Sequence, residues 1–129
     1  MADVLLDTNV FIDYYRGDLG ASQVIAQAER GEFQAAVSVV TTFELWRWSL
    51  ITVLEQTAYE RLFGFIEEAV LTQSMARQAG LWLRMYTEKQ QERILRDALI
   101  AATAVGLGAV IYTRNERDFH LFSAAVQRY

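Results

Sequence analysis

The sequence contains no cysteine and no proline, and it has a single histidine, His120. Without cysteine, disulfide bonds and thiolate metal sites are excluded, so a metal ion would bind through oxygen ligands or through His120. Without proline, the boundaries of helices and strands have to be read from hydrophobic periodicity and from glycine. These absences suit a reducing cytosol and favour oxygen ligands for any metal.

Long apolar segments are also absent. The longest one, residues 98–112, is interrupted by Gly106 and Gly108 and is shorter than the roughly 20 residues that cross a bilayer. The N-terminal stretch carries Asp3 and is interrupted by Asp7, which is the wrong charge and order for a secretory signal. We therefore expect a cytoplasmic protein without a membrane segment.

Length and charge restrict the possible partners. With 129 residues, 53% of them apolar, the chain is expected to form a single domain, residues 1–129, around a sizeable core. Its net charge is −4, whereas most proteins that hold nucleic acid through phosphates are basic. Binding to nucleic acid would need local positive charge. The candidates are Arg16, Arg47, Arg114 and Arg117, although arginines on an ordinary solvated surface fit the same pattern.

Short apolar runs alternate along the chain with segments of helical periodicity. Such alternation predicts a parallel sheet with helices on both faces. We expect strands at residues 4–6, 35–40, 69–71 and 109–113. We expect helices at residues 11–16, 22–30, 41 to about 54, 59–66, 74–85 and 96–105.

Four carboxylates stand at the ends of these expected elements. Asp7 follows the first strand, Glu44 opens the helix after the second, Asp97 lies in the first turn of the helix before the fourth, and Asp118 lies in the loop after it. In open parallel sheets, the functional crevice lies beyond the carboxyl ends of the strands. We therefore expect the four side chains to converge at one edge of the sheet.

Carboxylates gathered in one place raise one another's pKa, and a cluster that stays ionised needs a cation. Oxygen ligands alone select Mg²⁺ or Mn²⁺. Such ions polarise a phosphodiester and make water a better nucleophile. The pattern therefore favours metal-assisted hydrolysis of phosphodiester bonds.

Each acid also has a purely structural interpretation. Glu44 has capping-box spacing from Thr41, Asp97 is an acid that a helix dipole favours, and Asp118 fits an N-cap or an ordinary loop. Asp7 is different, because an ionised group directly after a buried strand is costly unless it is paired or bound to a metal. A functional role is therefore favoured most strongly for Asp7.

Four segments resemble the motifs of PIN-domain nucleases, and in particular those of VapC-type toxins. They are residues 6–13 (LDTNVFID), 42–45 (TFEL), 96–104 (RDALIAATA) and 113–119 (TRNERDF). The motifs stand in the family's order and cover essentially the whole chain. A lone Asp-Thr-Asn would carry little weight, but the four together make the resemblance specific.

The resemblance implies an α/β/α sandwich around a central, mainly parallel sheet of four to five strands. It also implies an endoribonuclease that depends on Mg²⁺, with Mn²⁺ as an alternative. Asp7 and Asp97 would be the main metal ligands, and Glu44 and Asp118 would bind a second ion or orient water. The polar side chains that would support this acidic pocket are those of Thr8, Asn9, Thr113 and Asn115. Asn115 and Asp118 compete as the loop residue nearer the metal, and we favour Asp118 because it is ionised.

By the same resemblance, the chain would form a homodimer and would be silenced by a small antitoxin whose basic or aromatic tail enters the acidic cleft. The substrate would be RNA. The aromatic-rich segments 11–15 and 42–54 are our candidates for antitoxin contact. In the second segment, Trp46 with Leu50 and Val53 is expected to form a helical stripe that packs in the core or at an interface, in preference to stacking on bases.

Three other functions compete with that of a toxin. A PIN-domain nuclease of RNA maturation would share every motif. A catalytically silent PIN-like binding module is less well supported, because all four acids are present. A phosphatase of the haloacid dehalogenase kind needs a second aspartate where Asn9 stands. A mechanism based on histidine is not favoured, because His120 is expected at the surface or in packing.

Overall fold

The computed structural model describes residues 2–129, which contain five strands and seven helices. In chain order the elements are β1 (Val4–Leu6), α1 (Thr8–Tyr15), α2 (Leu19–Glu29), β2 (Ala35–Ser38), α3 (Val39–Trp46), α4 (Val53–Leu62), β3 (Glu67–Ala69), α5 (Gln73–Leu83), α6 (Glu88–Leu107), β4 (Val110–Tyr112), α7 (Glu116–Phe119) and β5 (Val126–Gln127). Within residues 2–129, no helix is long and apolar enough to cross a membrane.

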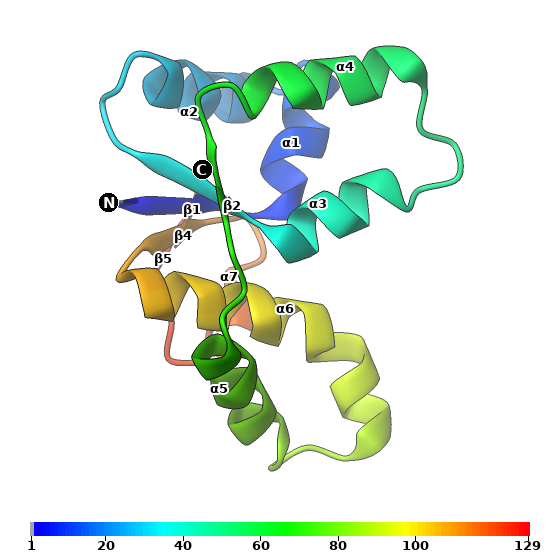
Figure 1. Ribbon diagram of the computed structural model, residues 1–129, viewed down its shortest axis with the longest axis vertical. Coiled ribbons are helices and arrows are strands. Elements are labelled where there is room, and N and C mark those ends of the chain that lie inside the picture. Colours follow the sequence, from blue (N-terminus) through cyan, green and yellow to red (C-terminus); the bar gives the residue numbers. More distant parts are fainter. Residues whose placement is uncertain (1) are drawn as a thin grey trace.

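The strands form one sheet in the order β3-β2-β1-β4-β5, and every neighbouring pair is parallel. Figure 1 shows α1, α2 and α4 on one side of this sheet and α5 and α6 on the other. The predicted α/β/α sandwich with a parallel sheet of four to five strands is therefore confirmed. Strand β1 lies at the centre, so ligands are expected beyond its carboxyl end, where the strand order reverses.

Side chains along the buried strands point alternately to the two faces of the sheet, and this divides the interior into two hydrophobic cores. Val4 and Leu6 of β1 pack with α1, α2 and α4, whereas Leu5 between them packs with α5 and α6. Successive side chains of a strand point to opposite faces, and here both faces are covered. A strand without a solvent-exposed face therefore appears in the sequence as a continuous apolar run.

The first two helices begin earlier than predicted because aspartates cap them. Helix α1 begins at Thr8 instead of residue 11, and the Thr8 amide donates a hydrogen bond of 2.8 Å to the Asp7 side chain. Likewise, α2 begins at Leu19 instead of residue 22, because Asp18 caps it. Side-chain oxygens at this position satisfy amides that have no partner within the helix.

The predicted capping box of Thr41 and Glu44 is also wrong. Ser38 caps α3 by accepting a hydrogen bond from the Val40 amide at 3.0 Å, so the helix begins at Val39, inside the predicted strand. Both Thr41 and Glu44 consequently lie within the helix. A capping role therefore does not explain why a glutamate stands at position 44.

The helix predicted for residues 41–54 is two helices, because α3 ends at Trp46 and a loop leads to α4. The expected stripe of Trp46, Leu50 and Val53 therefore does not form. Trp46 stacks on Phe63 in the core at 5.9 Å between ring centroids, whereas Leu50 and Val53 are exposed.

Helix α6 begins at Glu88, well before the predicted residue 96, so Asp97 lies in its interior and not in its first turn. The early turns are polar and show no apolar periodicity, but Thr87 and Gln90 form a capping box at the true start. The favourable interaction of an acid with the helix dipole in the first turn therefore does not explain why an aspartate stands at position 97. The helix ends at Gly108, which has a left-handed φ of 67°, as expected of a stop glycine.

The remaining differences are small. Strand β3 ends at residue 69, where the predicted strand began, and β5 had not been located in the sequence. The predicted helix 59–66 corresponds to the second half of α4 and the turn after it. The predicted helix 74–85 and strand 109–113 are confirmed to within two residues by α5 and β4.

Gly80 and Gly108 offer a matched test of where α6 ends. A Cβ at Gly108 would be strained by its positive φ, whereas one at Gly80, within α5, would meet no atom within 4 Å. We expect Gly108→Ala to lower the free energy of unfolding by about 1 kcal/mol and Gly80→Ala to raise it by about 0.5–1 kcal/mol. Urea denaturation measures both changes, and stabilisation by both substitutions would contradict the left-handed end of α6.

Candidate active site

The Asp7 carboxylate lies at the carboxyl end of the central strand β1 and is 4% exposed. One oxygen accepts a hydrogen bond from the Thr8 amide and the other from the Thr113 hydroxyl, both at 2.8 Å. Thr113 follows β4, and its hydroxyl accepts in turn from the Asn115 amide at 2.8 Å. Asp7 is thus fixed between the start of α1 and the β4–α7 loop.

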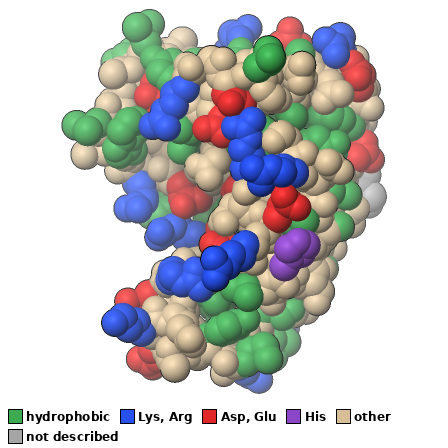
Figure 2. All heavy atoms as spheres, turned by 180° about the vertical axis from the view of Figure 1, so that it is seen from behind, with side chains coloured by type: hydrophobic (Ala, Val, Ile, Leu, Met, Phe, Trp, Pro, Cys, Tyr) green, Lys and Arg blue, Asp and Glu red, His purple; other side chains and the backbone are tan. Residues whose placement is uncertain are grey.

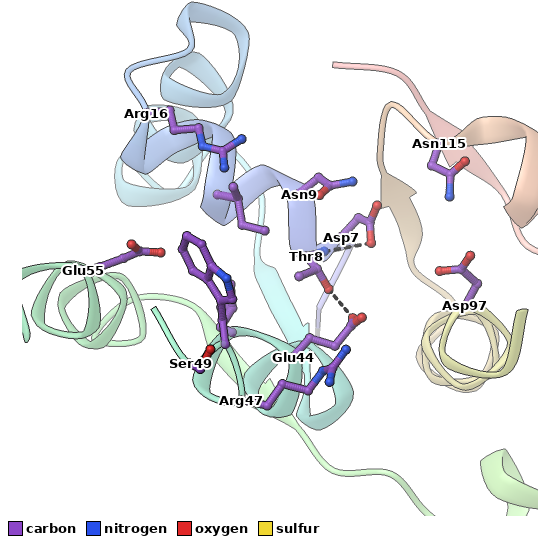
Figure 3. A pocket seen from close by; sticks show the side chains of 13 residues that line it. Asp7, Thr8, Asn9, Arg16, Glu44, Arg47, Ser49, Glu55, Asp97 and Asn115 are labelled. Atoms are coloured by element: carbon purple, nitrogen blue, oxygen red, sulfur yellow. Dashed lines mark hydrogen bonds between the residues drawn. The ribbon is translucent and has the colours of Figure 1, made fainter. Parts of the chain in front are cut away.

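Asp97 approaches the same place from α6, on the other side of the sheet. Figure 3 shows its carboxylate directed toward Asp7 and Asn115. The side chain is partly buried, and no hydrogen bond or ion pair to a described residue holds it. Its two oxygens are therefore available to a ligand.

Burial and mutual repulsion disfavour the ionised forms of both aspartates. Burial raises the pKa of Asp97 to about 7, with the charges of Asp7, Asp118 and Glu44 acting in the same direction. Burial also raises the pKa of Asp7 to about 6, although the hydrogen bonds from Thr113 and Thr8 oppose the change. Asp7 is buried and Asp97 is partly buried, and a cation placed between them would favour their ionised forms.

Glu44 lies beside this pair on α3, and its negative charge is compensated by an arginine. Its Oε1 accepts a hydrogen bond from the Thr8 hydroxyl at 2.7 Å, and its Oε2 lies 3.0 Å from Nε of Arg96. The Thr8 hydroxyl is also 2.9 Å from that of Thr41. Thr8 therefore links the capping residue of α1 to the acid on α3.

The structure resolves the positions of the two competing loop residues. Asn115 lines the cavity, whereas Asp118 does not. Asp118 accepts a hydrogen bond from Nδ2 of Asn115 at 3.1 Å and lies 3.5 Å from Arg93. The Asn115 side chain thus faces the cavity and Asp118 accepts a hydrogen bond from it, while our preference for Asp118 as the residue nearer a metal ion stays a prediction.

A cavity of about 500 Å³ opens beside the two aspartates. Figure 3 shows Asp97 and Asn115 on one side of it and Arg16, Ser49 and Glu55 on the other. The lining residues are Asp7, Thr8, Asn9, Ile12, Arg16, Glu44, Leu45, Arg47, Trp48, Ser49, Glu55, Asp97 and Asn115.

The cavity brings together six of the eight predicted site residues, namely Asp7, Thr8, Asn9, Glu44, Asp97 and Asn115. Thr113 and Asp118 support it from outside. The sequence reasoning missed Ile12, Leu45, Ser49 and Glu55. Ser49 was hidden because the loop after α3 had been predicted as helix, and the acid at Glu55 falls in none of the four motifs.

Only some of the candidate arginines reach the cavity. Arg16 and Arg47 line it, and neither pairs with a carboxylate of the described residues. Arg117 is exposed and outside it. Figure 2 shows basic and acidic side chains interleaved across one face, with the single histidine, His120, at the surface. The position of His120 agrees with its expected surface role.

Arg114 has a structural role instead. Its guanidinium makes two hydrogen bonds to Asp18, at 2.8 and 3.0 Å, and one to Asp13 at 3.3 Å. It also lies 4.3 Å from the ring centre of Tyr129, whose hydroxyl donates to Asp13 at 2.5 Å. This cluster ties the β4–α7 loop, which carries Asn115, to helices α1 and α2.

The donor set fits a divalent cation. Among residues 2–129, no group of three or more acidic or histidine side chains is arranged to hold a metal ion by itself. Mg²⁺, however, is usually bound through one or two carboxylates, with water and substrate phosphates completing its coordination. Asp7 and Asp97 supply two carboxylates, and Asn115 supplies a neutral oxygen. Glu44 and Asp118 are engaged by arginines, so Asp7 and Asp97 are the carboxylates of this set that have no ion pair within the described residues.

Known proteins resemble this chain over nearly its full length. Residues 4–124 match the PIN domain family. The chain is 30% identical to ribonuclease VapC19 of Mycobacterium tuberculosis, over 92% of this chain and 93% of that protein. It is 32% identical to ribonuclease VapC10 of the same organism, over 92% and 87%. A solved toxin-antitoxin complex from Klebsiella pneumoniae is 28% identical and has a TM-score of 0.74, with 97% of each chain covered. The chain belongs to the PIN domain family, as its four motifs predicted.

The raised pKa values predict how stability depends on pH without metal. Because the folded-state pKa values of Asp7 and Asp97 lie above the usual 3.8, their contribution to stability is full below about pH 4 and is lost as pH rises through 6 and 7. In Asp97→Asn, the side chain at position 97 cannot ionise, so the variant loses less stability than the wild type as pH rises. We expect its Tm to exceed that of the wild type by at least about 3 °C at pH 8, and by less at pH 5.

Differential scanning calorimetry in the presence of a chelator measures the difference. Glu92→Gln is the matched control, since Glu92 is exposed on the same helix and has no ion pair in residues 2–129. A Tm difference for Asp97→Asn that stays constant between pH 5 and pH 8 would show that Asp97 ionises normally.

Proposed function

We propose that this protein is a metal-dependent endoribonuclease and the toxin of a toxin-antitoxin pair. The observation that carries the proposal is the facing pair of Asp7 and Asp97, both with pKa values raised toward neutrality, at the wall of an open cavity. The names of two relatives, ribonucleases VapC19 and VapC10, support RNA as the substrate.

Asp7 and Asp97 would hold Mg²⁺ or Mn²⁺. The chemistry that such an ion supplies when bound is polarisation of the phosphodiester and neutralisation of charge on its oxygens. Thr113 and the Thr8 amide orient Asp7 through the two hydrogen bonds described above. Glu44 is held by Thr8 and Arg96, so we assign it to orienting the attacking water in preference to binding a second ion.

Arg16 and Arg47 provide the local positive charge that an acidic protein needs to hold RNA. Both line the cavity, and neither is neutralised by a carboxylate of the described chain. The other arginines near the aspartates, Arg93, Arg96 and Arg114, are each engaged by an acid. A phosphate beside the cleaved bond would therefore contact Arg47, and Arg16 would add positive charge at the far end of the cavity.

We further propose a small antitoxin as the partner, a homodimer as the assembly, and the cytoplasm as the place of action. The similar structure from Klebsiella pneumoniae is a toxin-antitoxin complex. The acidic cavity would attract a basic side chain of the antitoxin. Leu50, Val53 and Leu54, within the segment predicted for antitoxin contact, are each more than 70% exposed and would pack against an apolar partner.

The cleavage mechanism predicts that Asp7→Asn and Asp97→Asn each lower the rate at least about 100-fold, because each removes a direct metal ligand. The assay is hydrolysis of a mixed RNA pool by purified, antitoxin-free protein, with Mg²⁺, with Mn²⁺ and with chelator. Glu92→Gln should retain the wild-type rate. Cleavage that persists in chelator or in both aspartate variants would refute the assigned ligands.

A toxin and a nuclease of RNA maturation share this chemistry, so a growth assay separates them. Induced expression of the wild-type chain in a bacterial host should arrest growth, whereas Asp97→Asn at the same protein level should not. Co-expression with the antitoxin gene should restore growth. Normal growth with the active wild-type protein would favour RNA maturation, and arrest by the inactive variant would favour a silent binding module.

A further inference from the structure

The cavity extends well beyond the two aspartates, and its far part has a chemistry of its own. There the wall is made by Arg16 directly after α1, by Trp48 and Ser49 of the loop after α3, and by Glu55 of α4. Figure 3 shows Arg16, Ser49 and Glu55 on the side away from Asp97. None of these four residues is needed to hold a cation at the aspartate pair.

Trp48 provides a flat apolar surface at this end. Its side chain is 46% exposed, and it makes no ring contact with another aromatic residue of the described chain. In contrast, Trp46 is partly buried and packs on Tyr59 and Phe63. Ile12 and Leu45 add further apolar surface to the cavity wall. An exposed indole in a cavity that also holds Arg16 and Arg47 is suited to stacking on an unpaired nucleic-acid base.

Glu55 provides a fixed acceptor facing the same space. It is only 7% exposed, and its Oε2 accepts a hydrogen bond from the buried Tyr59 hydroxyl at 2.5 Å. This bond holds the carboxylate in place and leaves Oε1 without a partner among the described residues. A carboxylate that is ionised only accepts hydrogen bonds, so it selects a ligand edge that carries N–H donors.

Arg16 adds donors to this acceptor. Its guanidinium has no carboxylate partner in residues 2–129. Guanine combines two adjacent donors, N1–H and the N2 amino group, with acceptors at O6 and N7, which arginine commonly contacts. Adenine carries an acceptor at N1 and has no donor at C2, so it does not match Glu55 in the same way.

We propose that Trp48, Glu55 and Arg16 form a pocket for an unpaired guanine next to the cleaved phosphodiester. The indole of Trp48 lies against the base, Glu55 accepts from N1–H and the N2 amino group, and Arg16 donates to O6. This inference rests on the proposed function, since it assumes that the substrate is RNA. It names the substrate as a single-stranded segment containing guanine.

Binding measured without cleavage tests the pocket separately from catalysis. The protein is the full-length Asp97→Asn variant, and the probes are fluorescent oligouridine strands that contain one guanine, one inosine or one adenine. Fluorescence anisotropy should give a Kd for the guanine strand at least about fivefold lower than for the adenine strand. Inosine, which lacks the N2 amino group, should fall between them.

Substitutions assign the preference to individual side chains. Glu55→Gln keeps an acceptor for Tyr59 but should abolish the preference for guanine, whereas the control Glu60→Gln, exposed on the same helix, should retain it. Trp48→Ala should weaken binding of all three strands by about fivefold or more, and Trp48→Phe by less.

Equal Kd values for guanine and adenine strands, or a guanine preference that survives Glu55→Gln, would overturn the pocket. The wild-type protein with Mg²⁺ then tests catalysis on the same strands. Cleavage without base preference would refute the guanine pocket but would still support the proposed nuclease activity. A guanine preference in binding that depends on Glu55 would support the pocket, even if no strand were cleaved and the proposed hydrolysis failed.

Discussion

Asp7 directly follows β1, a strand that has no solvent-exposed face, and its carboxylate therefore lies where water is largely excluded. A charge in such a place has to be compensated by hydrogen bonds and by an opposite charge. The Thr8 amide and the Thr113 hydroxyl supply the hydrogen bonds, and through them the carboxylate joins α1 to the loop after β4. Asp97, brought in by α6, adds repulsion where a positive charge would reduce it. These two carboxylates are therefore the place where we propose that a cation binds.

The distribution of arginines determines which carboxylates lack an opposite charge. Arg96 neutralises Glu44 and Arg93 lies beside Asp118, so the outer acids are already compensated, while Asp7 and Asp97 have no ion pair within the described residues. Arg114 is engaged with Asp13 and Asp18 and stabilises the loop that presents Asn115. Arg16 and Arg47 are left to face the cavity. A chain of net charge −4 can therefore offer positive charge where a phosphate would bind.

Much of the fold and of the site was accessible from the sequence, because the signals were local. The apolar run before Asp7 located β1, and the four motifs identified the acids. The start of α6 was misplaced because residues 88–96 are polar on most sides, and so Asp97 was assigned to a first turn. Contacts between distant residues left no local signal: neither the pairing of Glu44 with Arg96 nor the position of Asn115 in front of Asp118 follows from spacing. Glu55 was overlooked for the same reason.

Calorimetric titration of the purified protein with Mg²⁺ and with Mn²⁺ at pH 6.5, in two buffers that differ in ionisation enthalpy, tests the central claim most directly. Ligands that are partly protonated must release protons when a metal binds. Since the pKa values of Asp7 and Asp97 are raised to about 6 and about 7, the account predicts saturable binding with proton release, and both should disappear in the double variant Asp7→Asn with Asp97→Asn. Binding that is unchanged in the double variant, or an absence of binding by the wild-type protein, would contradict the claim that this pair of aspartates is the metal site.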